Sequence, residues 1–350
     1  MTTTTNTSVA TTPATAPGAP DGGSPVRRLS LLKPTGHLTL GNYLGAIRAM
    51  AAEADAAAFY GIADLHALTV PHEPARLRAL VREMQALLLA CGVDPERVTV
   101  FVQSRVPAHS ELCYLLESTA FVGELGRMIQ FKEKGRGRPR TRVSLFTYPA
   151  LMAADILLYR TTEVPVGDDQ RQHVELTRDL AIRFNRAYGE VFTVPRIAAP
   201  PVGARVMDLL DPASKMGKSH QHGAGIVYLL DPPDVVARKI ARAVTDSDPG
   251  PGAVRHDPAA KPGVSNLLDI VAACEGRQPA RVAAGLSSYG ELKRRATEAV
   301  LSVLEPIQRR YVDLVADPSY VYEVYAQGSR RCREETEPVL AAAQAAVGLH

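Results

Sequence analysis

The chain of 350 residues contains no tryptophan, only four cysteines and no long apolar run. The cysteines, Cys91, Cys113, Cys274 and Cys332, are far apart. This spacing excludes the C-x-x-C and Cys/His patterns of zinc and iron–sulfur sites, so we predict no metal site built by the protein. Isolated thiols also indicate a reducing cytoplasm. No apolar stretch approaches the roughly 20 residues that span a bilayer, so we predict no membrane partner.

The chain also lacks a large excess of one charge, because its 40 Lys and Arg residues nearly balance its 37 Asp and Glu residues, for a net charge of +3. This balance argues against a chain-wide nucleic-acid surface but allows local basic patches. A hydrophobic content of 46% suffices for one large domain or two modest ones. Residues 1–26 have almost no apolar bulk, so we predict a disordered tail and no secretory signal there.

Strands and helices alternate in the first third of the folded chain. We expect strands at 28–32, 57–64 and 98–104, and helices at 43–54 and 74–92. This order is typical of an α/β fold with a parallel sheet and right-handed crossovers. Ligands bind such sheets beyond the carboxyl ends of the strands. The glycine-containing turn after the first strand, Asp64–His66 and Gln103–Ser104 all fall at those ends.

Helices dominate the remainder. We expect one long helix at 110–134, a basic loop at 135–144 and a helix at 148–159 with Pro149 in its first turn. A strand end and an acidic turn at 162–169 lead into a further helix, and the chain after residue 220 is mostly helical. The apolar stripe of the stretch 291–317 is the clearest, and it contains Leu292, Ala296, Leu304, Ile307, Tyr311 and Leu314.

Two short motifs have the composition of phosphate-binding turns. The first, SLLKPTGHLTLGNY at 30–43, places Gly36 and Gly41 between a strand and a helix, where backbone N–H groups bind anions. It is neither a P-loop nor a dinucleotide fingerprint. The second, SKMGKS at 214–219, carries two lysines three residues apart, which suit a loop that closes on a polyphosphate. Taken alone, the first motif is equally compatible with an ordinary turn, and the second is more typical of a solvated basic loop.

Together, the pattern P-x-G-x-L-x-x-G-N and the later K-M-x-K-S resemble the class I aminoacyl-tRNA synthetases. TLGN stands where that class has its HIGH motif, and KMGKS stands where it has KMSKS. Further segments resemble the bacterial tryptophanyl-tRNA synthetases over about residues 28–348. They include GNYLGAIR, DLHALTV, FVQSRVPAHSEL, GELGRMIQFKEK, YPALMAADILLY, VPVGDDQRQHVELTRDLAIRFN, GARVMDLLDP, AVTDSD and KPGVSNLLDI.

The resemblance implies a domain organisation and a reaction. It implies a Rossmann-type parallel-sheet catalytic domain at 27–210, a mobile KMSKS-like loop at 211–223 and a helical anticodon-binding region at 224–350. The tryptophan carboxylate attacks the α-phosphate of ATP, which brings Mg²⁺, and tryptophanyl-adenylate and pyrophosphate form. A hydroxyl of tRNA(Trp) then takes the tryptophan. The family is a homodimer, and we expect it in the cytoplasm.

The resemblance also assigns site residues. The implied catalytic residues, which hold the triphosphate from two sides, are Thr39, Gly41, Asn42, Lys215, Lys218 and Ser219. The implied ATP-binding residues are Lys33, Pro34, Thr35, Gly41, Asn42, Gly167, Asp168, Asp169, Val206, Lys215, Met216, Gly217, Lys218 and Ser219. The implied tryptophan-binding residues are Asp155, Tyr148, Met152, Val164, Val166, Gln170 and His66.

One of these assignments also has a basis in the residues themselves. Tyr148, Met152 and Asp155 are spaced i, i+4 and i+7, so they share one face of a helix. A carboxylate on the otherwise apolar helix ALMAADILLY is costly unless a group donates to it. An indole N–H is such a donor, and the resemblance gives Asp155 this role. A site that hydrogen-bonds its substrate rejects analogues that lack the group.

The sequence departs from the family at three positions. Lys33 stands where glutamine is usual, Leu65 where glutamine is common, and Gly217 where KMSKS has serine. We hypothesise a specialised paralogue that refuses indole-containing mimics of tryptophan. The lack of tryptophan supports a weaker hypothesis, that the enzyme is made when charged tRNA(Trp) is scarce. Tyrosyl-tRNA synthetase and a non-catalytic paralogue that binds RNA or protein are the alternatives.

Overall fold

The computed structural model describes residues 27–52, 55, 57–135, 137–198, 205–217, 223–248, 250 and 252–349. The predicted tail at 1–26 lies outside these residues, as do Lys218 and Ser219 of the second motif. All further statements concern the described residues.

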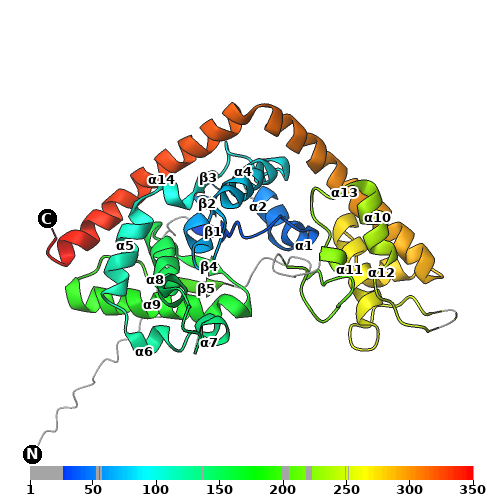
Figure 1. Ribbon diagram of the computed structural model, residues 1–350, viewed down its shortest axis with the longest axis horizontal. Coiled ribbons are helices and arrows are strands. Elements are labelled where there is room, and N and C mark those ends of the chain that lie inside the picture. Colours follow the sequence, from blue (N-terminus) through cyan, green and yellow to red (C-terminus); the bar gives the residue numbers. More distant parts are fainter. Residues whose placement is uncertain are drawn as a thin grey trace, which may run out of the picture.

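A parallel sheet forms the centre of the N-terminal half (Figure 1). Strands β1 (Arg28–Leu32), β2 (Ala58–Ile62) and β3 (Thr99–Val102) are hydrogen-bonded in the order β1-β2-β3. A second parallel pair consists of β4 (Glu163–Pro165) and β5 (Arg196–Ala198). The three predicted strands and their parallel arrangement are therefore confirmed, although the second strand ends at Ile62 rather than Asp64.

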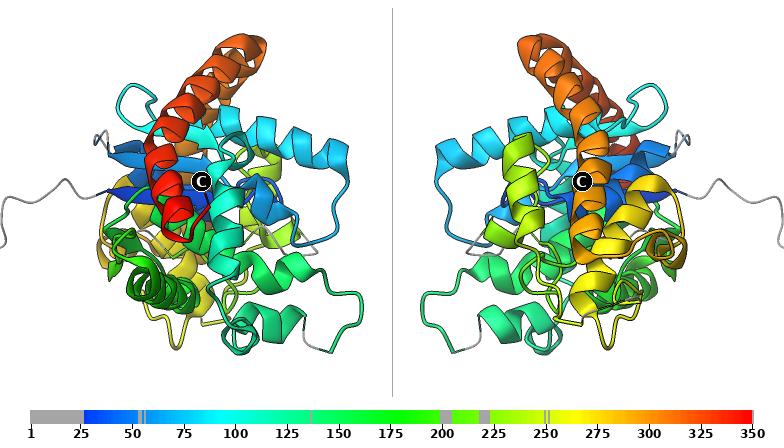
Figure 2. Two further views of the ribbon diagram at one scale, coloured as in Figure 1. Left: turned by 90° about the vertical axis from the view of Figure 1, so that its left-hand side faces the viewer. Right: turned by 90° about the vertical axis from the view of Figure 1, so that its right-hand side faces the viewer.

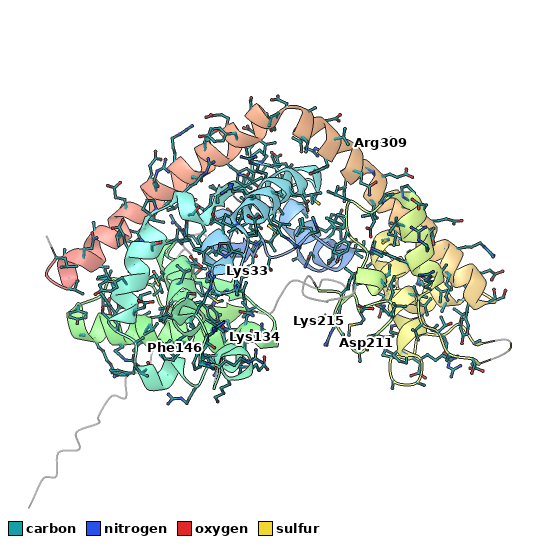
Figure 3. All side chains as sticks on the ribbon, in the orientation of Figure 1. Lys33, Lys134, Phe146, Asp211, Lys215 and Arg309 are labelled. Carbon is teal, nitrogen blue, oxygen red and sulfur yellow. The ribbon has the colours of Figure 1, made fainter. Side chains whose placement is uncertain are left out.

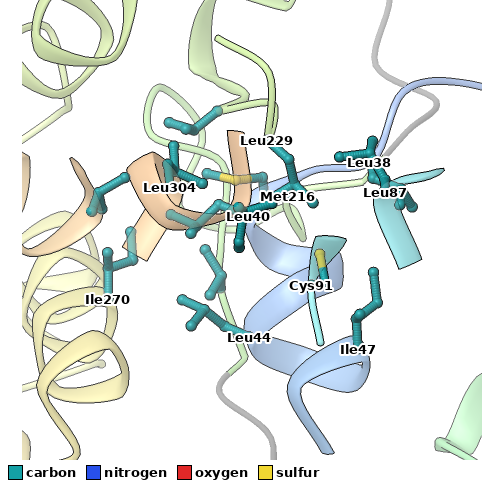
Figure 4. Close-up of a cluster of buried hydrophobic side chains, with 14 of the residues drawn as sticks. Leu38, Leu40, Leu44, Ile47, Leu87, Cys91, Met216, Leu229, Ile270 and Leu304 are labelled. Carbon is teal, nitrogen blue, oxygen red and sulfur yellow. The ribbon is translucent and has the colours of Figure 1, made fainter. Parts of the chain in front are cut away.

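The central strands are buried on both faces because their side chains point alternately into two apolar clusters. Phe59 and Phe101 belong to the cluster that contains α5 (Ala108–Glu117), α8 (Val143–Leu158) and α9 (Asp168–Tyr188), whereas Tyr60 and Ile62 face the cluster on the other side. Figure 4 shows part of this second cluster, where Leu38, Leu40 and Leu44 meet side chains from the C-terminal half. The sheet is thus fixed between two cores, and its carboxyl ends carry the polar residues.

Short helices connect these strands. The helix after β1 is continuous in sequence but consists of α1 (Leu40–Asn42), the π-helical η1 (Tyr43–Ile47) and α2 (Arg48–Ala52). The 3₁₀ segment η2 (Gln103–Arg105) follows β3 directly. Asp64 begins α3 (Asp64–Ala67), and α4 (Pro74–Ala90) ends before Gly92, which has a φ of 96°.

The single long helix predicted at 110–134 is wrong. The segment folds as α5 (Ala108–Glu117), α6 (Val122–Leu125) and α7 (Ile129–Lys134). The Glu124 carboxylate accepts a hydrogen bond from the Phe121 backbone N–H at 3.1 Å and so starts a new helix at α6. Phe121 and Val122 are 61% and 76% exposed, so they do not continue the buried face of α5.

The prediction that Pro149 lies in a first helical turn is also wrong. Helix α8 (Val143–Leu158) begins five residues earlier than expected, and Pro149 lies inside it. Val143 is 75% exposed, so the first turn of this helix does not share its buried apolar face, and the apolar pattern of the sequence does not indicate that the helix begins there. Helix α9 (Asp168–Tyr188) follows β4, as predicted, and packs against α8.

The C-terminal half is helical, as expected. It contains η3 (Gly223–Gly225), α10 (Pro233–Ala241), α11 (Pro262–Glu275), α12 (Pro279–Ala283), α13 (Tyr289–Ala316) and α14 (Pro318–Ala346). The stripe on α13 is buried at Leu292, Ala296, Leu304 and Ile307 and partly buried at Tyr311 and Leu314. The junction of α13 and α14 is the highest point of the molecule in Figures 1 and 2, and α14 returns from it to α5.

Helix α14 packs directly against β3 at Gly328. A Cβ added at Gly328 would lie 1.9 Å from the Val100 carbonyl oxygen and 2.9 Å from its carbonyl carbon. Because both neighbours are backbone atoms of a hydrogen-bonded strand, they cannot move aside as a side chain would. Glycine is therefore required for α14 to lie this close to the sheet.

We expect Gly328→Ala to destabilise the protein by about 1–3 kcal/mol, because the added methyl group pushes α14 from β3. Urea unfolding followed by circular dichroism measures this change. The matched control is Gly290→Ala in α13, where the nearest atom to an added Cβ is the Ser288 Oγ at 3.9 Å. The control should be neutral or slightly stabilising. Equal stability of Gly328→Ala and the wild type would contradict the prediction.

Candidate active site

The first motif is closed by a capping box at the start of α1. The Thr39 hydroxyl accepts a hydrogen bond from the Asn42 N–H at 3.1 Å. The Asn42 side-chain oxygen accepts one from the Thr39 N–H, also at 3.1 Å. The turn is further paired with the later chain, since the Leu40 N–H donates to the Val227 carbonyl and the Leu229 N–H to the Leu38 carbonyl.

The second motif extends from a short hairpin. The Met216 N–H donates to the Val206 carbonyl at 3.0 Å, and the Asp208 N–H donates to the Ser214 carbonyl at 2.8 Å. Val206 and Met216 are buried, whereas Lys215 is exposed and Gly217 is half-buried. Figure 3 places Lys215 on the side of the molecule toward the C-terminal helices.

The structure brings the two motifs into contact. The Thr39 hydroxyl donates to the Met216 carbonyl at 3.3 Å. A Cβ added at Gly41 would lie 2.8 Å from the same carbonyl oxygen, so the two backbones pass at a distance that only glycine permits without a shift. Two segments separated by more than 170 residues thus form adjacent walls of one site.

Lys33 directly follows β1, at the start of this turn, and its side chain reaches the segment after α3. Its Nζ donates to the Thr69 hydroxyl at 2.9 Å, and that hydroxyl donates to the His66 carbonyl at 2.9 Å. Burial of the ammonium group, with a smaller contribution from the charge of Lys134, lowers the pKa of Lys33. Of the neighbouring predicted ATP residues, Pro34 is buried and Thr35 is exposed.

Asp155 is fully buried at the centre of a polar cluster. Its Oδ1 accepts hydrogen bonds from the Gln103 side-chain amide at 2.7 Å and from His109 Nδ1 at 2.6 Å. Its Oδ2 lies 2.7 Å from His66 Nε2. Burial alone would raise the pKa of this carboxyl, but the hydrogen bonds and charge of His109 and His66 outweigh it and lower the pKa to about 2.

This cluster corrects one step of the sequence argument. The Asp155 carboxylate does not need a substrate to offset its burial, because three side chains of the chain itself already bond to it. It is also not an exposed aspartate on a helix surface. A carboxylate has about four acceptor positions, two on each oxygen, and among the described residues His66 occupies one of the two on Oδ2.

Among the other predicted tryptophan-binding residues, Tyr148 contacts this cluster through His66. The His66 and Tyr148 rings meet edge to face with centroids 6.2 Å apart, and the Tyr148 hydroxyl is hydrogen-bonded to His173 Nε2. Burial raises the pKa of Tyr148. Val164 is buried, and Met152 and Val166 pack half-buried against the same apolar core. The Gln170 N–H donates to the carbonyl of Gly167, which caps α9. The side chains of Asp168 and Asp169 lie outside the description.

Three contributions were not predicted from the sequence: those of His109 and Thr69, and the hydrogen bond of the Gln103 side chain to Asp155. Each of these residues is polar and buried next to an apolar strand or helix, so each needs a partner inside the protein. The sequence therefore indicates that each of these residues needs a buried partner. It does not show that Gln103 and His109 pair with Asp155, because that pairing depends on the packing of α5 on α8.

Three further features of the described residues bear on the chemistry. None of their His, Cys, Asp and Glu side chains form a group of three or more suited to a metal ion. None of the described helices has the length and apolar character needed to cross a membrane. The four cysteines are free thiols.

Known proteins share this sequence and fold. The family described as tRNA synthetases class I (W and Y) matches residues 23–305. Tryptophan–tRNA ligase 1 of Streptomyces coelicolor is 55% identical over 329 residues, which are 92% of this chain and 97% of that protein. The crystal structure of tryptophanyl-tRNA synthetase from Mycoplasma pneumoniae superposes with a TM-score of 0.83 at 34% identity, covering 93% of this chain and 98% of that one.

The synthetase from Campylobacter jejuni, solved in complex with ADP and tryptophan, has a TM-score of 0.78 at 30% identity and covers 93% of this chain and 100% of that one. With the family match extending over well over half of its residues, the chain belongs to the class I tRNA synthetases. Within that class it is a member of the bacterial-type tryptophanyl-tRNA synthetases.

We expect the Asp155 carboxylate to make stability depend on pH. Its folded pKa of about 2 lies below its ordinary value of 3.8, so its contribution is present above about pH 4 and is lost as the pH falls through about 2. The difference in unfolding free energy between wild type and Asp155→Asn should therefore shrink by about 1 kcal/mol between pH 5 and pH 3. Urea unfolding of both proteins measures it, and parallel pH curves would contradict it.

Proposed function

We propose that the chain is a tryptophan–tRNA ligase that activates L-tryptophan with ATP and transfers it to tRNA(Trp). The observation that carries the proposal is the contact of Thr39 and Gly41 with Met216, which joins the two phosphate motifs in one site. The names of the relatives support tryptophan rather than tyrosine as the amino acid.

The ATP triphosphate lies between the turn at Thr39–Asn42 and the loop that begins at Lys215. Thr39 and Asn42 bond to each other, so they fix the backbone of the turn, and Gly41 leaves its N–H accessible to a phosphate oxygen. Lys215, exposed at the hairpin end, places positive charge on the leaving pyrophosphate from the other side. Lys218 and Ser219, which lie outside the described residues, are the further members of this motif that we assign to the triphosphate. Catalysis then consists of positioning and charge stabilisation, with no protein nucleophile.

The nucleotide base and ribose lie along the backbone of Val206 and the turn at Gly167–Asp169, as the resemblance implies. Lys33, Pro34, Thr35, Met216 and Gly217 complete this side. Mg²⁺ enters with the phosphates of ATP, since ATP-bound Mg²⁺ takes most of its ligands from phosphate and water.

Tryptophan occupies the pocket beside α8. The indole N–H donates to Asp155 Oδ2 at its remaining acceptor position, and Met152, Val164 and Val166 cover the ring. Tyr148 and Gln170 hold the α-ammonium group, and His66 lies next to both Asp155 and Tyr148. His66, Gln103 and His109 already bond to the Asp155 carboxylate, so an amino acid without an N–H leaves only the remaining acceptor position on Oδ2 unpaired, and the pocket disfavours it for that reason.

Several partners follow from the same proposal. The chain acts as a cytoplasmic homodimer, which is supported by the free cysteines and by apolar side chains exposed on α5 and α6. Tyr114 is 70% exposed and adds to Phe121 and Val122 on this surface. Sedimentation of the full chain tests the dimer.

The predicted anticodon region at 224–350 binds tRNA(Trp), and arginines of α13 and α14 contact the tRNA phosphates.

We expect wild-type protein to exchange labelled pyrophosphate into ATP with tryptophan and not with tyrosine. Lys215→Ala should lower the exchange rate by about 10²–10³-fold, because it removes charge stabilisation from the transition state. The matched control is Arg238→Ala, which removes an exposed cation paired with Asp234 on α10 and should leave the rate unchanged. Absence of exchange with tryptophan would favour a non-catalytic paralogue, and exchange with tyrosine would favour the tyrosyl enzyme.

We further propose that Lys33 restricts which tryptophan-like molecules bind. Thr69 holds its ammonium group beside the segment that carries His66 and Leu65, so a full charge lies next to the tryptophan pocket. Indole-type inhibitors that mimic tryptophan meet this charge. Gly217, the third departure from the family, has no side chain with which to hold such a ligand.

We expect Lys33→Gln to be at least about tenfold more sensitive to indole-based tryptophan mimics than the wild type, since it removes a poorly hydrated charge. Inhibition of pyrophosphate exchange measures it. Lys134→Gln is the matched control, because Lys134 is exposed and affects Lys33 only through its charge. If Lys33→Gln shows no gain in sensitivity, this specialised role is wrong.

A further inference from the structure

We propose that His109 is a positioning residue that orients the Asp155 carboxylate for recognition of the tryptophan indole. His109 and Asp155 are both completely buried, and they come from α5 and α8, two helices that pack against each other. The inference rests on the proposed role of Asp155 in binding the indole N–H. It adds a residue that touches neither substrate.

The hydrogen bonds determine which ring nitrogen of His109 donates to Asp155. Nδ1 lies 2.6 Å from Asp155 Oδ1, and an ionised carboxylate only accepts, so Nδ1 donates. Nε2 is hydrogen-bonded to the Tyr159 hydroxyl at 3.0 Å. Tyr159 is also fully buried and lies in contact with the His109 ring. The imidazole is therefore fixed at both ends, and Phe101 stacks on it with centroids 5.8 Å apart.

This fixed ring determines the direction of the carboxylate. Gln103 and His109 both donate to Oδ1, so rotation about the last side-chain bond of Asp155 would break two hydrogen bonds at once. Oδ2 is thereby held on the side of His66, where the proposed function places the indole N–H. A preoriented acceptor discriminates better than a mobile one because a ligand without the donor leaves it unpaired.

Two substitutions distinguish the roles of the two ring nitrogens of His109, Nδ1 and Nε2. His109→Asn keeps an amide N–H near the place of Nδ1 and loses the contact with Tyr159. His109→Gln places its amide near Nε2 and loses the donor to Asp155. The two variants have similar chemistry, so a difference between them reports on the Asp155 bond.

The readout is the ratio of kcat/KM for tryptophan to that for its benzothienyl analogue, in which sulfur replaces the indole N–H. We expect His109→Gln to lower this ratio by about 10–100-fold, with KM for ATP unchanged, because Oδ1 loses a donor. His109→Asn should stay within about threefold of the wild-type ratio. A ratio unchanged in folded His109→Gln overturns the proposal, as does an equal fall in both variants.

A second variant covers failure of His109→Gln to fold. Gln103→Met removes the other donor to Oδ1 and is expected to lower the same ratio, and an unchanged ratio there overturns the proposal. Failure of the proposed function is a distinct result, since wild type would then show no tryptophan-dependent exchange or no preference for tryptophan over the analogue.

Discussion

The contact between Thr39 and the Met216 carbonyl joins the two halves of the molecule at the site. One hydrogen bond of this kind contributes only about 1 kcal/mol, so it cannot hold the halves together alone. The backbone bonds of Leu40 to Val227 and of Leu229 to Leu38 set the register beside it. Gly41 then allows the closest approach. The phosphate motifs meet because the chain after the hairpin pairs with the turn after β1.

Because the two motifs meet in the folded chain, they indicated the site even though the sequence pattern around each motif is weak. Local patterns predicted some of the secondary structure and missed the rest. The strands at 28–32, 57–64 and 98–104 were predictable because each is a short apolar run between turn residues, and strands buried on both faces have this pattern. Their parallel order followed from the intervening helices. The break of 110–134 into three helices was not predictable from periodicity, because it depends on the Glu124 carboxylate returning to the Phe121 N–H.

Some features of the candidate site were likewise predictable from the sequence, and others were not. The proximity of Tyr148, Met152 and Asp155 follows from helical spacing, and the position of His66 follows from its place at the end of a strand. The partners of Asp155 do not follow from spacing, because Gln103, His109 and His66 come from three different elements. The sequence showed that a buried carboxylate needs donors, but an apolar helix alone cannot indicate whether they come from a ligand or from the protein. Here the protein supplies them.

The close packing of Gly328 on Val100 also has a consequence for biosynthesis. Strand β3 lies at the edge of the three-stranded sheet, and α14, which covers it, is made after everything it touches. Until α14 has been synthesised and has docked, the β3 edge is open to pairing with other chains. Premature termination within α14 would leave this edge uncovered.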